Sequence, residues 1–247
     1  MDQQQLDQMN SIRWFHRIEL EPGLFTPGEC PHTAALATSR FGMPEDLTGK
    51  TVLDIGSWDG LFSFEAEKRN ALFVQAIDTV REKGGHWGGT DGFEFARKYL
   101  NSNVDYCNNS IHDFRNAMTE EEIEKDDQIG LMFDRTEDHS KDFDVRGGYD
   151  IVLFYGVLYH LTDPIAALKK VFNLTKEFAL IETAYCKSDS QDCLWEYAPF
   201  REGDETNYWY PTYWGLLKTL ASVGFNKERM EVIWQDDYRM TIKVYKQ

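Results

Sequence analysis

The sequence predicts an α/β fold, in which a mostly parallel sheet carries helices on both faces. Three observations lead to it. An apolar run, Thr51 to Ile55, ends in a glycine-bearing turn and passes into a helix-like segment, Leu61 to Lys68. A second apolar run over residues 72–78 follows at the distance that a βαβ unit requires. Apolar runs and helical patterns then keep alternating along the chain, which is typical of a doubly wound sheet.

The turn between the first run and the helix has the features of a nucleotide-binding loop. Gly56 has no Cβ, so the backbone can turn there and approach a ligand closely. Gly60 allows the helix to start close to the strand, where free N–H groups attract a carboxylate or phosphate. Asp78 ends the second apolar run, at the position from which an acidic side chain reaches a ribose diol.

The pattern Asp54-x-Gly56-x-x-x-Gly60 departs from the dinucleotide fingerprint G-x-G-x-x-G. It resembles the first motif of the class I S-adenosylmethionine-dependent methyltransferases, in which an acid is followed by G-x-G-x-G. Trp58 stands where the middle glycine usually is, and its indole either flanks the cofactor or packs under the turn.

The resemblance covers about residues 50–247 and implies a Rossmann-like, seven-stranded methyltransferase sheet with an antiparallel last strand. It also implies S-adenosylmethionine as the cofactor. Tyr155 either stacks near the adenine or stays within the sheet. The residues expected to bind the cofactor are Asp54, Gly56, Ser57, Trp58, Gly60, Asp78, Ser110, Ile111, Tyr155 and Gly156.

Residues 1–47 precede the nucleotide unit and are predicted to form an N-terminal cap over the cofactor or substrate mouth, with residues 48–247 as the methyltransferase domain. Apolar residues between Asp7 and Leu20 have a helix-like spacing. His16, beside that face, is a candidate general base.

The next predicted elements are a helix with Phe93, Ala96 and Leu100 on one face, and a third strand near residues 104–107. Residues 109–113 follow that strand, at the place where this fold usually contacts the adenine ring.

Residues 119–145 interrupt the pattern with eleven acids against three bases, so we expect an acidic insertion that is exposed and lies outside the core. A metal site at Asp134, Asp138 and His139 is the less favoured alternative, because charge runs are usually solvated faces. No metal is therefore predicted.

The second half of the chain continues the alternation. A near-continuous apolar run, residues 149–155, predicts a strand covered on both faces. Asp163 and Pro164 then suit the cap and first position of a helix with Ile165, Leu168 and Phe172 as its apolar stripe. The remaining expected elements are a strand at 178–184, an aromatic-rich loop at 195–211, a helix at 212–223 ended by Gly224, and strands at 231–235 and 240–245.

The segment Gly156-Val157-Leu158-Tyr159-His160-Leu161, with Pro164 after it, is similar to the branch that contains the wobble-uridine tRNA carboxymethyltransferases and small-molecule relatives. That resemblance implies that Tyr159 contributes to the active site. His160, at the end of a central strand, is either a general base or a histidine that hydrogen-bonds a backbone carbonyl and shapes the turn.

Composition narrows the function. The 247-residue chain carries a net charge of −16, and proteins that bind nucleic acid use clustered Lys and Arg, so a small neutral or cationic substrate is favoured over tRNA. We find no membrane-length apolar run and no signal peptide, and four scattered cysteines suit a reducing cytosol, so a cytoplasmic location is expected.

The predicted function is methyl transfer to oxygen or nitrogen of a small molecule. The alternatives are tRNA modification by the same chemistry and a cofactor-binding subunit without catalysis. The sequence leaves the oligomeric state open.

Overall fold

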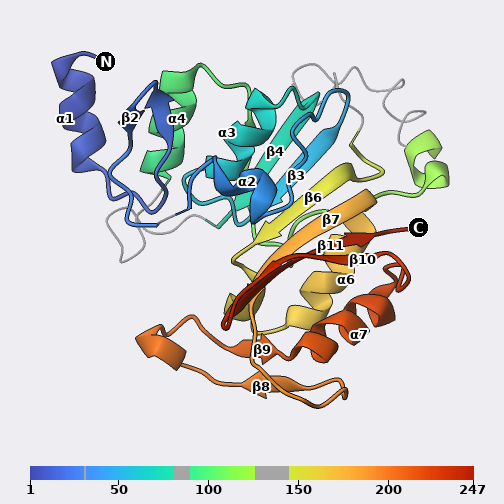
Figure 1. Cartoon of the computed structure of the whole chain (residues 1–247). Coiled ribbons are helices and arrows are strands. Elements are labelled where there is room, and N and C mark those ends of the chain that lie inside the picture. Colours follow the sequence, from blue (N-terminus) through green and yellow to red (C-terminus); the bar gives the residue numbers. More distant parts are fainter. Residues whose placement is uncertain (31, 80–89, 126–144) are drawn as a thin grey trace.

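The computed structural model describes residues 1–30, 32–79, 90–125 and 145–247. Its centre is a seven-stranded sheet with the order β10-β11-β7-β6-β3-β4-β5 (Figure 1). The strands are β3 Thr51–Ile55, β4 Phe73–Asp78, β5 Asp105–Asn108, β6 Tyr149–Tyr155, β7 Thr175–Ala184, β10 Met230–Gln235 and β11 Arg239–Tyr245.

The direction of the strands confirms the predicted sheet. Strands β3 to β7 are parallel to one another, and β11 runs antiparallel between β7 and β10. The C-terminal ends of β3, β4 and β6 therefore meet at one edge, which is where ligands bind in open α/β sheets.

Helices cover both faces of the sheet, as expected. Helices α3 Leu61–Lys68 and α4 Asp91–Leu100 pack on one face, and α6 Pro164–Leu174 and α7 Tyr213–Val223 pack on the other (Figure 1). Side-chain caps start the last two helices, and the first of them, Asp163, was predicted. Asp163 accepts the Ala166 N–H at 3.0 Å, and Thr212 accepts the Gly215 N–H at 3.0 Å.

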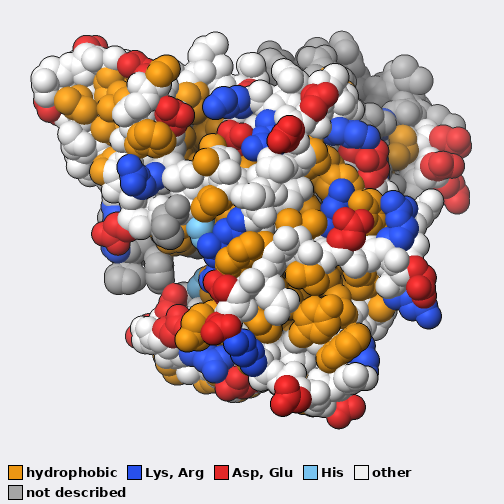
Figure 2. Space-filling view, in the orientation of Figure 1, with side chains coloured by type: hydrophobic (Ala, Val, Ile, Leu, Met, Phe, Trp, Pro, Cys, Tyr) orange, Lys and Arg blue, Asp and Glu red, His pale blue; other side chains and the backbone are white. Residues whose placement is uncertain are grey.

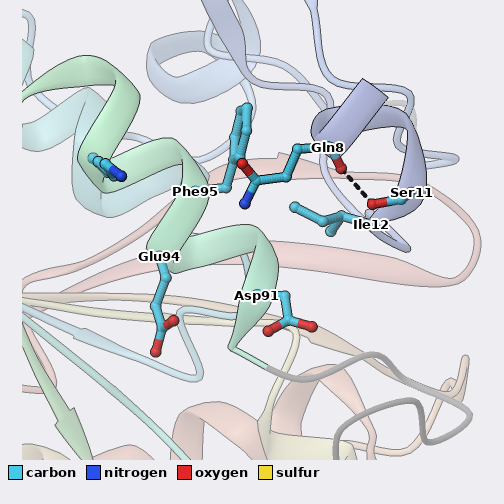
Figure 3. Close-up of a pocket in the computed structure, with 7 residues that line it drawn as sticks. Gln8, Ser11, Ile12, Asp91, Glu94 and Phe95 are labelled. Atoms are coloured by element: carbon cyan, nitrogen blue, oxygen red, sulfur yellow. Dashed lines mark hydrogen bonds between the residues drawn. The ribbon is translucent and has the colours of Figure 1, made fainter. Parts of the chain in front are cut away.

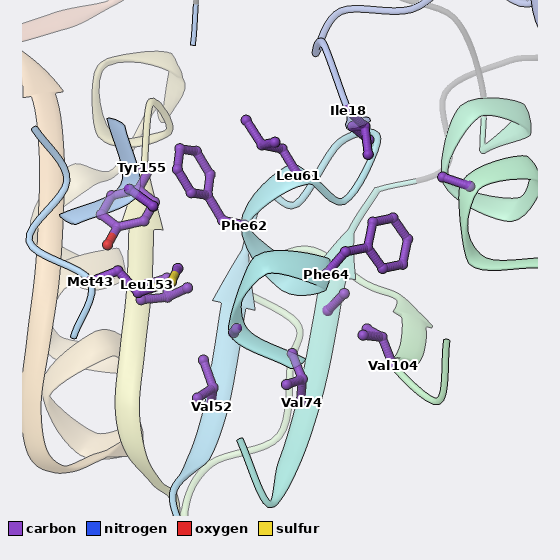
Figure 4. Packing of buried hydrophobic residues seen from close by; sticks show 14 of the residues in the cluster. Ile18, Met43, Val52, Leu61, Phe62, Phe64, Val74, Val104, Leu153 and Tyr155 are labelled. Carbon is purple, nitrogen blue, oxygen red and sulfur yellow. The ribbon is translucent and has the colours of Figure 1, made fainter. Parts of the chain in front are cut away.

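Each face of the sheet has its own apolar cluster. Figure 4 shows part of the first cluster, where Phe62 of α3 lies beside Tyr155 of β6 and Phe64 lies above β4. The second cluster joins the other face of β3, β6 and β7 to α6 and α7. Because successive residues of a strand face opposite sides, Leu153 belongs to the first cluster and Phe154 to the second.

The N-terminal segment packs into the first cluster on the side of α3 and α4 (Figure 1). Its elements are α1 Gln3–Ser11, β1 Glu19–Glu21, β2 Leu24–Phe25 and α2 Leu36–Ser39. Its buried apolar residues in that cluster are Met9, Trp14, Ile18, Leu20, Ala37, Phe41, Met43 and Leu47. The proposed division at residues 47 and 48 thus separates segments that share one core.

Three local predictions were wrong. The N-terminal helix spans Gln3–Ser11 rather than residues 7–20, because Asp2 and Gln5 form a capping box at its start and the chain is extended from Ile12. Ile165 is exposed, whereas Leu168 is buried as predicted, together with Pro164, Ala167, Val171 and Leu174. The aromatic segment is a hairpin, because β8 Trp195–Tyr197 pairs with β9 Trp209–Pro211.

The acidic segment is described only at its two ends. Residues 119–125 are mostly exposed, whereas Val145 is buried in the second cluster. The Met118 N–H donates to the Arg146 carbonyl at 2.7 Å, so the two ends lie side by side. Asp134, Asp138 and His139 lie outside the described residues, as do the residues between 126 and 144.

In the described part of the chain, no helix combines the length and apolar character that crossing a membrane requires.

Candidate active site

The glycine turn after β3 has the backbone conformation that its sequence requires. Gly56 and Gly60 have φ values of 75° and 88°, in the left-handed region that favours glycine. The N–H groups of Gly56 and Ser57 donate to the Ile77 carbonyl at 2.8 and 3.2 Å, so the turn is bound to the end of β4.

Both glycines also permit close packing. A Cβ at Gly60 would lie 2.6 Å from the Phe64 ring and 2.8 Å from the Phe93 ring. A Cβ at Gly56 would lie 2.3 Å from the Val157 side chain. Gly60 therefore sets the approach of α3 and α4, and Gly56 sets the approach of the segment that follows β6.

Trp58 occupies the left-handed region with φ 49°, which explains why glycine usually stands there. Its backbone N–H donates to the Asp78 carboxylate at 2.8 Å. Its indole stacks on Phe15 with ring centroids 4.4 Å apart. Asp78 also accepts the Thr79 N–H at 2.7 Å. Asp78 thus ties the turn to the end of β4, next to the position expected for a ribose.

Asp54 faces α3 from the buried strand β3. Its carboxylate accepts the Ser63 hydroxyl at 2.6 Å. Burial raises its pKa to about 7; the Ser63 hydrogen bond opposes this shift, and the charge of Asp78 adds to it. Asp54 therefore braces the strand against the first turn of the helix.

Asp59 is a buried residue of the turn that sequence reasoning missed. Its carboxylate accepts the N–H groups of Phe15 and His16 at 2.7 and 2.9 Å. These bonds fasten the N-terminal segment to the glycine turn. The sequence did contain a sign of this role, because Asp59 lies inside the motif and no predicted ligand contact accounted for it.

His16 is buried beside Phe15 and Phe62. Burial, with a smaller contribution from His32, lowers its pKa to about 3. Its Nδ1 lies 3.9 Å from the nearer Asp59 oxygen and has no hydrogen-bond partner among the described residues.

Three other predicted residues lie around this edge. The Tyr155 ring packs on Phe41 and Phe62, and its hydroxyl donates to the Phe41 carbonyl at 2.9 Å, so its side chain belongs to the core. Ser110 donates to Asp113 at 2.7 Å, and Ile111 is buried in the second cluster. Both follow β5, whose last residue, Asn108, pairs with Asp78.

Tyr159 and His160 lie in a short 3-10 helix, η2 Leu158–His160, after β6. The His160 Nδ1 lies 2.9 Å from the Thr206 hydroxyl and 3.1 Å from its carbonyl. That hydroxyl donates to Asp204 at 2.6 Å, so both Thr206 oxygens act as acceptors toward Nδ1. Nδ1 therefore carries the hydrogen in the neutral ring, and Nε2 carries the lone pair.

An ion pair beside Tyr159, between a buried glutamate and a partly buried arginine, was also missed. Arg239, the first residue of β11, donates through Nε and Nη2 to the two Glu182 oxygens at 2.6 and 2.8 Å. Its Nη1 and Nη2 both lie 3.2 Å from the Tyr159 hydroxyl. Burial alone would lower the pKa of Arg239, but the hydrogen bonds and charge of Glu182 raise it above its ordinary value. Glu182 stands in the apolar strand β7, and a buried carboxylate requires a cationic or hydrogen-bonding partner, which was the available sign of the pair.

The segment after β6 joins these groups into one site. Val157 packs against Gly56 of the cofactor turn, and Gly156 adjoins Tyr159, Glu182 and Arg239. The glycine turn with Asp78 forms one half of the site, and the cluster of Tyr159, Glu182 and Arg239 forms the other.

These residues fit S-adenosylmethionine. The Ser57 hydroxyl is buried and has no hydrogen-bond partner among the described residues, so it can bind a polar ligand atom. Asp78 supplies a carboxylate at the C-terminal end of β4, the chemistry and the place that a ribose diol requires.

A groove of about 390 Å³ lies elsewhere, between α1 and α4 (Figure 3). The residues that line it are Gln8, Ser11, Ile12, Asp91, Glu94, Phe95 and Lys98, and none of them belongs to the site above. Within the described ranges, no group of three or more His, Cys, Asp or Glu side chains is placed to hold a metal ion.

Comparison with solved structures supports the fold. The N-terminal domain of EvdMO1, crystallised in the presence of S-adenosylhomocysteine and D-fucose, has a TM-score of 0.61 at 17% identity, covering 99% of this chain and 96% of that chain. The match covers 48% of the longer EvdMO1 structure.

Two further structures are similar. The 1,6-didemethyltoxoflavin-N1-methyltransferase of Burkholderia thailandensis, with bound 1,6-didemethyltoxoflavin and S-adenosylhomocysteine, has a TM-score of 0.52 at 12% identity, covering 86% of this chain and 75% of that one. The [4+2]-cyclase SpnF has a TM-score of 0.55 at 10% identity, covering 86% and 79%. Such low identities show a shared fold and leave the substrate open.

No curated protein sequence matches the chain significantly. The family model described as a methyltransferase domain matches residues 29–229, most of the chain and both halves of the site except Arg239. The chain therefore belongs to the methyltransferase domain family and is a class I S-adenosylmethionine-dependent methyltransferase.

Proposed function

We propose that this enzyme transfers the methyl group of S-adenosylmethionine to an oxygen or nitrogen atom of a small molecule, by in-line displacement. The observation that carries the proposal is the contact of Val157 with Gly56, which brings the turn of Tyr159 and His160 against the cofactor turn. The cofactor supplies an activated methyl group, so the protein has mainly to align it with the nucleophile.

The residues divide into two sets of roles. Asp78 holds the ribose hydroxyls, and the glycine turn with Ser57 receives the polar groups of the cofactor. Ser110 and Ile111 lie at the adenine end. The Phe15–Trp58 pair and the Asp59 contacts support the cap role of residues 1–47, because they hold that segment over the cofactor turn.

His160 is the group that we assign to remove a proton, where the nucleophile carries one. Its Nδ1–H is held by Thr206, which leaves Nε2 as the atom that accepts a proton. His16 is the weaker candidate, since a pKa of about 3 makes it a poor proton acceptor near neutral pH.

A small molecule is favoured over tRNA by charge. The chain has 42 acidic residues against 26 basic ones. On the face shown in Figure 2, the described acidic and basic side chains are interspersed, whereas a surface that binds RNA backbone is continuously basic. The two structural neighbours crystallised in the presence of D-fucose or with bound 1,6-didemethyltoxoflavin give further support for a small substrate.

The test incubates the pure enzyme with methyl-tritiated S-adenosylmethionine and, separately, fractionated metabolite extract or total tRNA. We expect label in a small-molecule fraction, and Asp78→Ala as a matched control should lose it. Label in tRNA would favour the tRNA alternative. Calorimetric binding of S-adenosylmethionine without any labelled product would favour the cofactor-binding subunit.

A further inference from the structure

The Tyr159 hydroxyl lies against a guanidinium that also binds a carboxylate. Arg239 forms a two-point contact with Glu182, at 2.6 and 2.8 Å, on one side. On the other side, both of its Nη groups point to the Tyr159 oxygen at 3.2 Å. The fork geometry of Arg fixes all three groups relative to one another.

This arrangement decides which way the tyrosine can act. A guanidinium only donates hydrogen bonds, so the phenol oxygen is the acceptor in both contacts and its own hydrogen must find an acceptor elsewhere. No such acceptor is present among the described residues. Burial raises the pKa of Tyr159; Arg239 opposes this shift, and Glu182 and Asp204 add to it, so the phenol keeps its hydrogen at neutral pH.

The charges nearby limit which acceptor the Tyr159 hydroxyl hydrogen can bind. The Glu182 side chain is 1% exposed and neutralises Arg239, so the pair presents no net positive charge to a ligand. A substrate carboxylate at this place would lie near the Glu182 carboxylate without a cation left to balance it. An uncharged acceptor oxygen does not meet that repulsion.

Gly156 lies beside the Tyr159 hydroxyl and the ion pair, and it carries no side chain that could cover them. An atom at the position of its absent Cβ would lie 3.9 Å from the Tyr159 hydroxyl, 3.7 Å from Arg239 Nη2 and 3.9 Å from Glu182 Oε2. These are ordinary contact distances. Because residue 156 has no side chain, no side-chain atom of its own lies between the backbone and these three groups.

We propose that the Tyr159 hydroxyl is a donor subsite for an uncharged acceptor oxygen of the substrate, such as a carbonyl, hydroxyl or ether oxygen, and that Arg239 and Glu182 are positioning residues for it. The inference rests on the proposed function, because it places a small-molecule substrate at this edge of the sheet. The oxygen that Tyr159 binds lies beside the nucleophile, since a hydrogen bond to the attacking atom would hold the electron pair that must reach the methyl group.

The first experiment measures turnover of the compound that the wild-type enzyme labels most strongly. Tyr159→Phe should lower kcat/KM by about tenfold, as loss of one hydrogen bond to a buried group does. Arg239→Lys should give a similar loss alone, but less than a twofold further loss in the Tyr159→Phe background, because it acts through the tyrosine. Equal losses in both backgrounds would show that Arg239 contacts the substrate itself and overturn the proposal.

A second variant guards against misfolding. Glu182→Met/Arg239→Met removes both charges at once and so avoids a buried unpaired ion. We expect it to bind S-adenosylhomocysteine as the wild type does and to turn over like Tyr159→Phe. Wild-type turnover in this variant would contradict the positioning role.

The donor role has a test that needs no substrate. Protein labelled with [4-13C]tyrosine and saturated with S-adenosylhomocysteine is titrated by NMR, with Tyr159→Phe identifying the signal. We expect the Tyr159 midpoint above pH 10. A midpoint below pH 7 would make the group a phenolate acceptor at neutral pH and overturn the inference, even where a small molecule is methylated. Absence of any labelled compound in the wild-type reaction contradicts the proposed function instead.

Discussion

The two halves of the site are built in different ways. The cofactor half lies within one stretch of chain, from Asp54 to Asp78, and works largely through backbone groups: N–H donors at the turn and carboxylates that fasten them. The other half consists of side chains from the ends of three strands: Tyr159 follows β6, Glu182 lies near the end of β7, and Arg239 begins β11. Only their side chains contact one another. A backbone site requires glycines at fixed spacing and is visible in the sequence, whereas a side-chain site depends on tertiary pairing.

A substitution in one half should therefore leave the properties of the other half largely unchanged. The largest effect is expected for Glu182→Ala, which leaves Arg239 without its carboxylate. We expect the free energy of unfolding in urea to fall by about 3 kcal/mol. The affinity for S-adenosylhomocysteine of the folded variant should stay within a few-fold of the wild type.

Glu182→Met/Arg239→Met is the matched control, because it removes the pair without stranding a charge. Its loss of stability should be clearly smaller. Equal losses in the two variants would mean that packing around residue 182, rather than the ion pair, holds this region together.

Asp78→Ala is the corresponding substitution in the cofactor half. It should weaken S-adenosylmethionine binding at least tenfold by calorimetry, because charge-assisted hydrogen bonds to the ribose are lost. Asp78→Asn keeps an acceptor for the Trp58 N–H and should lose less. Unchanged affinity in Asp78→Ala would refute the assignment of β4 to the ribose.

A third test uses the pH dependence of stability. The pKa of Asp54 is about 7 in the folded protein against 3.8 in the unfolded chain, so the folded state holds this proton more tightly. Its contribution to stability is fully present below pH 3.8 and is lost as the pH rises through 7.

Asp54→Asn removes that contribution. The stability of the wild type minus that of the variant should therefore fall between pH 4 and 7, by at most about 1.4 kcal/mol per pH unit. His16, whose lowered pKa acts in the opposite direction, is present in both proteins and cancels. A constant difference across this range would contradict a protonated, buried Asp54.

The smallest effect is expected where neither half is touched. Replacing residues 126–144 with a short Gly/Ser linker should leave S-adenosylmethionine affinity unchanged within twofold, because the ends at Met118 and Arg146 already lie together. Loss of folded protein, measured by circular dichroism, would show that the acidic segment belongs to the core.

Sequence reasoning predicted the strands of the sheet and the main helices because their patterns are local. The glycine turn, the buried run of β6 and the cap Asp163 each depend on a few adjacent residues. The roles assigned to Tyr159, His160 and the cofactor residues stay predictions until the variants above are measured.

What the sequence did not reveal depends on contacts across the chain. The helix of the N-terminal segment ends at Ser11, and the extended chain beyond it supplies the Phe15 and His16 N–H groups to Asp59. A periodic apolar pattern continues past that point, so periodicity alone extended the helix too far. Likewise, the partner of Glu182 stands 57 residues away and has no local signature.

The place of β11 has a consequence for synthesis on the ribosome. β11 is the last strand of the sheet to be made, yet it pairs with β7 and carries Arg239. At ordinary elongation rates, roughly 3 to 11 s separate the synthesis of Ala184, the end of β7, from that of Arg239. During this interval the nascent chain has a complete cofactor half, an open β7 edge and a Glu182 without its cation. Translation that stops short of residues 239–247 thus leaves a chain that can hold the cofactor turn but not close the sheet.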